Sequence, residues 1–195
     1  MMRNRLLAAA KSARAWAAGA LKKQPETPDL RVLSTDSALK IIYFMMAADG
    51  LVFYSEEEKF DAIGREIDPS FVARREEIVR ACRKQLEKAA EADSYAAVIQ
   101  EGVEASLLAS KPGKDSFITP KLLVWDLLTV AFSEESYDED ERDLLTYIVR
   151  RTDVDEAVFH EMETLVEALM EAETADGRAA RKDEILARVQ ELIAK

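Results

Sequence analysis

Carboxylates gather at two points of the sequence, each directly after an apolar stretch. Asp49, Glu56 and Glu58 follow the apolar residues 41–48. The second group follows residues 122–132 and consists of Glu134, Glu135, Asp138 and Glu141. Oxygen ligands in this number suit Ca²⁺ or Mg²⁺ better than zinc. These seven residues are therefore the candidate metal ligands, and the sequence assigns no catalytic residue.

The same carboxylates also fit a purely structural role. Asp49-Gly50 is a strong turn signal, and Ser55 and Glu58 have the spacing of a capping box that opens a helix. Negative charge in the first turn of a helix is favoured by the helix dipole. An EF-hand is excluded, because counting from Asp49 places Leu51 and Phe53 where ligands would be needed. Metal binding and helix capping both stay open as interpretations of these turns.

The element before the first turn is predicted to be a buried helix. Residues 41–48 are apolar on every side, and this run of eight residues is too short to span a bilayer. A second helix is expected from Ser55 to about Ile67. Only six Gly and five Pro interrupt the 195 residues, and 48% of them are hydrophobic. These properties predict an all-α bundle of roughly seven to nine helices.

The second half of the sequence resembles the first. Thr119-Pro120 is typical of a helix start, residues 122–132 are again apolar nearly all round, and Asp138 and Glu141 have capping-box spacing. An offset of 83 residues pairs Leu39 with Leu122, Tyr54 with Tyr137 and Glu58 with Glu141. We therefore predict two pseudo-repeated helix-turn-helix units whose enclosed helices pack together at the centre.

Charge divides the chain unevenly. Residues 1–25 carry six bases and no acid, so the remainder has 27 − 6 = 21 bases against 38 acids, or −17. This acidic body disfavours nucleic-acid binding. Residues 1–23 form a basic amphipathic segment with Trp16, which predicts either peripheral contact with an anionic membrane or a loosely docked helix. Residues 24–33 are the expected linker, and residues 34–195 the expected helical domain.

Four other residue types that can carry chemistry are assigned ordinary roles. The lone Cys82 excludes an internal disulfide and a multi-thiolate zinc site, fits a reducing compartment, and falls on an apolar stripe. The lone His160 has no motif partner and is expected at the surface or its boundary. Met45, Met46 and Trp125 are expected in the core. No phosphate loop, nucleophile elbow or metalloprotease motif is present.

Residues 46–58 resemble the Ala-Asp-Gly-x-x-x-x-x-Glu hallmark of the tellurite-resistance TerB-like domain, here with two or three additional residues in the turn. The likeness covers roughly residues 36–170, and in the second unit Phe132-Ser133 stands where Asp-Gly would be. The resemblance implies a bacterial all-helical module, cytoplasmic or membrane-associated, linked to stress response and to divalent-metal binding through acidic residues. No His-Pro-Asp motif occurs, so the co-chaperone role of a DnaJ-like relative is not carried over.

The expected function is a non-enzymatic, TerB-like interaction module in stress response. It would bind an unidentified protein partner in the cytoplasm, at the inner membrane surface if residues 1–23 anchor it there. Two alternatives stay open. A metal-dependent hydrolase would use the acidic turns and would need an apolar pocket between them. A membrane-surface adaptor would need no metal.

Overall fold

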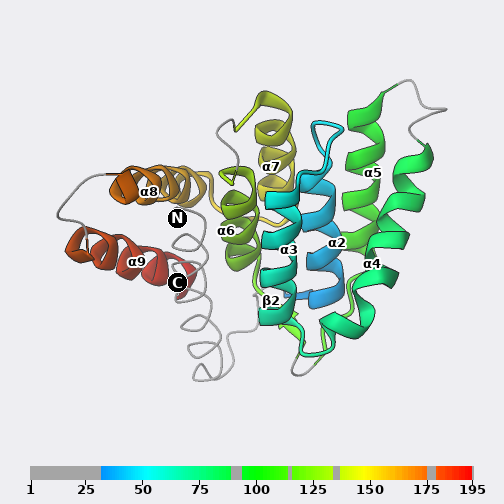
Figure 1. Ribbon diagram of the computed structural model, residues 1–195, viewed down its shortest axis with the longest axis horizontal. Helices are drawn as coiled ribbons and strands as arrows, with labels where there is room; N and C mark the ends of the chain where they lie inside the picture. Colours follow the sequence, from blue (N-terminus) through cyan, green and yellow to red (C-terminus); the bar gives the residue numbers. More distant parts are fainter. Residues whose placement is uncertain (1–31, 89–93, 114–115, 134–136, 175–178, 195) are drawn as a thin grey trace.

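The chain folds into a bundle of helices, which confirms the predicted all-α class. The computed structural model describes residues 32–88, 94–113, 116–133, 137–174 and 179–194. These residues form eight α-helices and two very short strands (Figure 1). The predicted amphipathic segment, residues 1–23, and all but the end of the predicted linker lie outside the described residues.

The elements fall into two successive sets of the same composition. The first set is β1 (Leu33–Ser34), α2 (Thr35–Met46), α3 (Tyr54–Ile67), α4 (Phe71–Leu86) and α5 (Tyr95–Leu108). The second is β2 (Phe117–Ile118), α6 (Pro120–Ala131), α7 (Glu139–Arg151), α8 (Glu156–Thr174) and α9 (Ala179–Ala194). Each element of the second set begins 84 or 85 residues after its counterpart. We call the two sets the first repeat and the second repeat.

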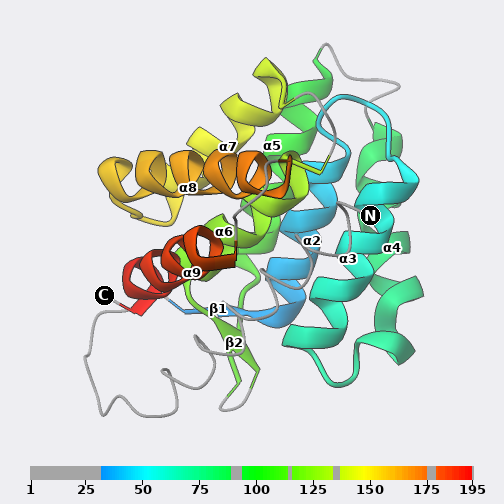
Figure 2. The same cartoon turned by 60° about the vertical axis from the view of Figure 1, so that its left-hand side comes forward.

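The two strands join the repeats at one end of the molecule. β1 and β2 pair antiparallel with Leu33 opposite Ile118, and Figure 2 shows them side by side. Each strand leads directly into a capped helix: Ser37 N donates to Ser34 Oγ at 3.2 Å, and Leu122 N donates to Thr119 Oγ1 at 3.4 Å. Both caps satisfy backbone donors that the helix itself leaves free. Leu33, placed in the linker by the sequence analysis, is a buried strand residue instead.

The centre of the bundle is the contact between α2 and α6, as predicted. Both helices are buried on almost every side; Leu39 on α2 and Trp125 and Leu127 on α6 are 0% exposed. Helices α3, α4, α5 and α7 also contact α2, whereas α3, α7, α8 and α9 also contact α6. A helix surrounded in this way must be apolar on nearly all sides, which is why α6 is apolar almost throughout and α2 is charged only in its first half, at Asp36 and Lys40.

The register of the repeat predicted from the sequence was two residues out. The N-caps Ser34 and Thr119, and the N-caps Phe53 and Asp138, are each 85 residues apart. Tyr54 and Tyr137 are therefore not equivalent, although an offset of 83 aligns them. In a helix that is apolar on every face, a shift of one or two residues still aligns apolar residues with apolar residues. Residue types alone therefore could not fix the register of the repeat.

The last two helices of each repeat are arranged differently. In the first repeat α5 lies along α2, and the ring of Phe44 fills the space that a Cβ at Gly102 would need, 2.5 Å away. In the second repeat α8 and α9 pack on each other as a pair that extends to one side of α6 (Figures 1 and 2). The last two helices of the two repeats thus pack differently against the central helices.

Candidate functional site

Both turns that carry the candidate residues lie at one end of the bundle. Helices α2 and α6 start from the β1–β2 pair and run away from it, so the turns after them meet at the opposite end (Figures 1 and 2). The sequence predicted two repeated units whose enclosed helices pack together, and a hydrolase would need a pocket between their acidic turns. The fold brings the two turns to the same end.

In the first turn, Asp49 and Gly50 shape the backbone that ends α2. Gly50 has a φ of 88°, a conformation that favours glycine. The Oδ1 atom of Asp49 accepts a hydrogen bond from Leu51 N at 2.8 Å. The hydroxyl of Tyr95 on α5 donates to the carbonyl of Ala47 at 2.7 Å. One oxygen of the Asp49 carboxylate is therefore engaged in the turn itself.

Helix α3 begins one residue earlier than its predicted cap. Its N-cap is Phe53, whose side chain has no acceptor, and Phe53 N donates to Glu56 Oε2 at 2.8 Å. The predicted pairing of Ser55 with Glu58 was therefore wrong, because Glu56 is the third residue of the helix. Glu56 is 4% exposed, while Glu58 is exposed and its charge raises the pKa of Tyr54. The two glutamates have different surroundings.

The residues between these caps form a continuous exposed apolar stretch, which we call the apolar loop. Leu51 is 60% exposed, Val52 37%, Phe53 42% and Tyr54 72%. Four successive large apolar side chains on the surface are unusual, whereas scattered single ones are normal. From the sequence these residues were interpreted as part of a turn and were not identified as a site. The signal was present in the sequence as an apolar run between two acidic positions.

The second turn is fixed by its own side chains. The rings of Phe132 and Tyr137 stack with their centroids 4.7 Å apart, and the Arg142 guanidinium lies 5.3 Å from the Tyr137 centroid. The Tyr137 hydroxyl donates to Glu163 Oε1 on α8 at 3.2 Å. Asp138 and Glu141 form the predicted capping box, with distances of 2.9 and 3.1 Å. This turn offers no exposed apolar stretch among its described residues.

Glu163 organises the second turn and was missed by the sequence analysis. Its side chain is 10% exposed and contacts Tyr137, Arg142 at 3.6 Å and His160 Nδ1 at 2.9 Å. Burial, followed by the charge of Glu163, raises the pKa of Tyr137. His160 itself is 70% exposed, which agrees with its expected surface position. These contacts link residues 137, 142, 160 and 163. Because these residues are far apart in the sequence, no short motif could have identified them.

The candidate carboxylates that the structure describes do not gather into one cluster. No group of three potential ligands lies close enough together to hold a metal within the parts of the chain that the structure describes. Asp49 and Glu56 accept backbone hydrogen bonds, Glu58 faces Tyr54, and Asp138 and Glu141 cap α7. Glu134 and Glu135 lie outside the described residues, so their part in the prediction stays a prediction.

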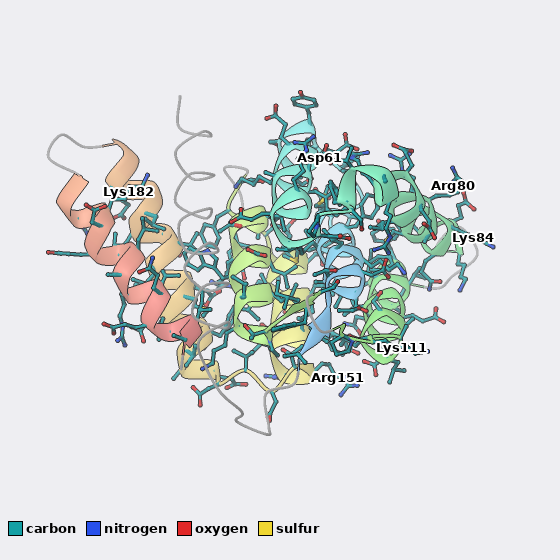
Figure 3. All side chains as sticks on the ribbon, turned by 90° about the horizontal axis from the view of Figure 1, so that it is seen from below. Asp61, Arg80, Lys84, Lys111, Arg151 and Lys182 are labelled. Atoms are coloured by element: carbon teal, nitrogen blue, oxygen red, sulfur yellow. The ribbon has the colours of Figure 1, made fainter. Side chains whose placement is uncertain are left out.

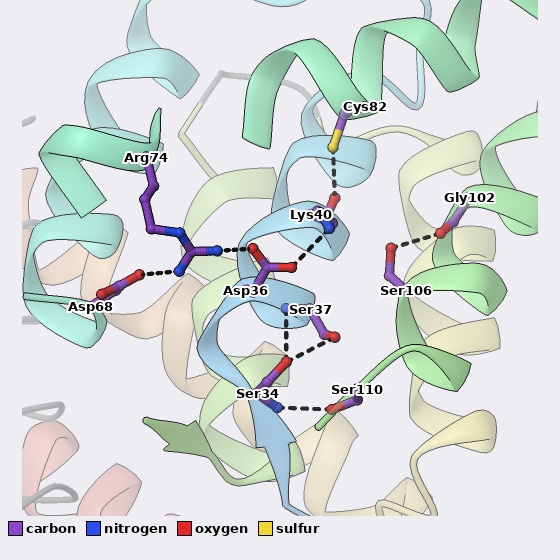
Figure 4. Close-up of polar contacts among 10 residues, drawn as sticks. All are labelled: Ser34, Asp36, Ser37, Lys40, Asp68, Arg74, Cys82, Gly102, Ser106 and Ser110. Atoms are coloured by element: carbon purple, nitrogen blue, oxygen red, sulfur yellow. Dashed lines mark hydrogen bonds and ion pairs between the residues drawn. The ribbon is translucent and has the colours of Figure 1, made fainter. Parts of the chain in front are cut away.

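Cys82 and the other chemically interesting core residues have ordinary surroundings. Cys82 is 1% exposed, its thiol faces the carbonyl of Lys40 at 3.9 Å (Figure 4), and burial raises its pKa to about 12. A thiol with so high a pKa is a poor nucleophile. It lines a cavity of about 250 Å³ between α2, α4 and α5. Met45, Met46 and Trp125 are buried in the core, as predicted.

Comparisons with known proteins identify no relative. No family model, no curated protein and no solved structure matches this chain. The resemblance to the TerB-like domain therefore remains a prediction. None of the described helices combines the length and the apolar composition that crossing a membrane requires.

Proposed function

We propose that this protein is a non-enzymatic interaction module that binds a partner protein through the apolar loop of its first repeat. The TerB-like identity and a role in stress response belong to the same proposal. They are supported by the Asp49-Gly50 turn that follows an enclosed helix and by the turn's recurrence, in altered form, in the second repeat.

The observation that carries the proposal is the exposure of residues 51–54, whereas Tyr137 in the corresponding turn of the second repeat packs against Phe132 and Glu163. Burying one large apolar side chain contributes about 1.5–3 kcal/mol. Aromatic side chains such as Phe53 and Tyr54 are frequent anchors of protein interfaces. The second repeat shows that a turn at this end can pack its aromatic residue inward, as Tyr137 does. Exposure of the first turn is thus not imposed by the fold.

The charges beside the apolar loop indicate the chemistry of the partner. Asp49 and Glu58 are exposed, and Glu57 lies on the same first turn of α3 with Arg83 4.0 Å away. An apolar surface with a carboxylate rim complements a basic amphipathic segment, and complementary charge raises both the association rate and the specificity. The partner that fits is an amphipathic helix with Lys or Arg on its polar face.

Two other functions receive less support. Arg80 and Lys84 lie together on α4, but Lys111, Arg151 and Lys182 lie on other segments away from them (Figure 3), whereas nucleic-acid binding needs many bases on one face. The hydrolase alternative needs a pocket between the acidic turns. The cavities of about 390 and 250 Å³ are lined by α4 and by α2, α4 and α5, and neither includes a residue of either turn.

Fluorescence anisotropy with a labelled peptide tests the proposal. The probe is a short designed helix of Leu, Trp and Lys, and its control replaces each Lys with Glu. We expect the full chain to bind the basic peptide, and Leu51→Ser with Phe53→Ser to weaken binding at least tenfold. The matched control is Val72→Ser with Leu108→Ser, because these residues are 72% and 76% exposed and lie on other elements. Equal binding by both double variants would refute the proposal.

A further inference from the structure

We propose that residues 1–23 of the same molecule bind the apolar loop, so that the protein covers its own interaction site. This inference rests on the proposed function, since it names a ligand for that site. Binding within one molecule would make the module self-inhibited, and an external partner would have to displace the segment.

Charge is the first argument for this ligand. Residues 1–25 contain six bases and no acid, whereas the rest of the chain carries a net charge of −17. The apolar loop lies among the carboxylates of Asp49, Glu57 and Glu58. The positive charge of the basic segment is therefore attracted by the carboxylates around the apolar loop. An anionic membrane surface, by contrast, would be repelled by the same carboxylates.

The apolar pattern of the segment is the second argument. At 100° per residue Leu6 and Leu21 fall on one face with several alanines, and Trp16 flanks that face. Small alanines bury little area by themselves, so the two leucines and the tryptophan would supply most of the contact. Leu51, Phe53 and Tyr54 are the exposed side chains they would meet. This pairing covers apolar surface on both sides.

The length of the intervening chain is the third argument. The described chain starts at Val32 beside β1, and the apolar loop lies beyond the far end of α2. Helix α2 has 12 residues and is about 18 Å long at 1.5 Å per residue. The eight residues 24–31 can span up to about 26 Å. An extended tether of this length can therefore reach past the far end of α2, so contact within one molecule is geometrically possible.

Tryptophan fluorescence of the full chain tests the inference. The protein has two tryptophans, and Trp125 is 0% exposed, so quenching by acrylamide reports mainly on Trp16. We expect slow quenching in the wild type and a several-fold steeper Stern–Volmer slope for Leu51→Ser with Phe53→Ser. Val72→Ser with Leu108→Ser should behave as the wild type does. Identical slopes in all three proteins would overturn the inference.

Two further measurements separate this inference from the proposed function. Protection of Trp16 should not depend on protein concentration; protection that grows with concentration would show binding to a second copy and overturn the inference. A full chain with Leu6→Ser and Trp16→Ser should bind the basic probe peptide at least tenfold more tightly than the wild type. Equally tight binding of the peptide by the wild type and by this variant would refute the self-inhibition but agree with the proposed function. If neither protein binds the peptide, both the self-inhibition and the proposed function are refuted.

Discussion

The two repeats share the order of their elements but differ at the end of the molecule where both turns lie. In the first repeat the turn exposes Leu51 to Tyr54 and fixes only its backbone, through Asp49 and Glu56. In the second repeat Tyr137 packs on Phe132 and donates to Glu163. In a duplicated fold, equivalent turns can thus differ, with an aromatic side chain packed inward in one repeat and apolar side chains exposed in the other.

One pair of equivalent positions in the central helices α2 and α6 also differs between the repeats. Trp125 on α6 and Lys40 on α2 are 85 residues apart and so occupy equivalent positions. Trp125 is fully buried, whereas the Lys40 side chain is 29% exposed and pairs with Asp36 at 2.8 Å. Figure 4 shows Asp36 between Lys40 and Arg74 at the surface of α2. Equivalent positions therefore have different energetic roles in the two repeats.

Removal of these two side chains should give the largest difference between the repeats. Trp125→Ala should destabilise the protein by about 3–5 kcal/mol, because it leaves a large cavity in the core. Lys40→Ala should cost less than about 1 kcal/mol, since it removes only a partly exposed ion pair. Urea unfolding followed by circular dichroism measures both. Similar costs for the two variants would show that the 85-residue register does not describe the packing.

The tyrosines of the two turns give a smaller contrast. Tyr137→Phe should cost about 1–2 kcal/mol, because the buried Glu163 loses a hydrogen-bond donor. Tyr54→Phe should change the free energy of unfolding by less than about 0.5 kcal/mol, because its hydroxyl is at an exposed position. The same urea titrations compare them. A larger cost for Tyr54→Phe would mean that the first turn is as closed as the second.

The closed turn should also make stability depend on alkaline pH. Burial and the charge of Glu163 raise the pKa of Tyr137, so the folded protein favours the neutral phenol. This stabilisation is fully present below the unfolded pKa of about 10 and is lost as pH rises above it. The stability advantage of the wild type over Tyr137→Phe should therefore shrink between about pH 9 and pH 11. An advantage that grows over this range would contradict the assignment.

The sequence predicted the architecture better than the site, and the reasons are local. Thr119 and the pair of Asp138 and Glu141 cap their helices with their own side chains, so these helix starts could be predicted from the sequence. Phe53 caps α3 without an acceptor, so the sequence pointed to Ser55 instead.

Contacts distant in the sequence could not be predicted in the same way. Glu163 joins the second turn only because α8 folds back beside α7. The apolar loop was visible as four adjacent residues, but only burial values distinguish an exposed run from a packed one.

Divalent cations should have the smallest effect. The described carboxylates of both turns already accept backbone hydrogen bonds or lie apart, so we expect millimolar Ca²⁺ or Mg²⁺ to leave the melting temperature unchanged. A cation site at a free cation concentration of 100 times its Kd would raise the free energy of unfolding by about 2.7 kcal/mol, an effect that calorimetry would detect easily.

The Asp49→Asn variant makes this measurement decisive for the first turn. An asparagine Oδ1 can still accept the hydrogen bond from Leu51 N, so the turn should keep its shape while it loses a charged ligand. We expect wild type and variant to melt alike with and without cation. If a cation instead stabilises the wild type and Asp49→Asn abolishes that effect, a metal site exists at the first turn. Stabilisation that survives Asp49→Asn would point to the second turn and to Glu134 and Glu135, and the difference between the repeats would then include their chemistry.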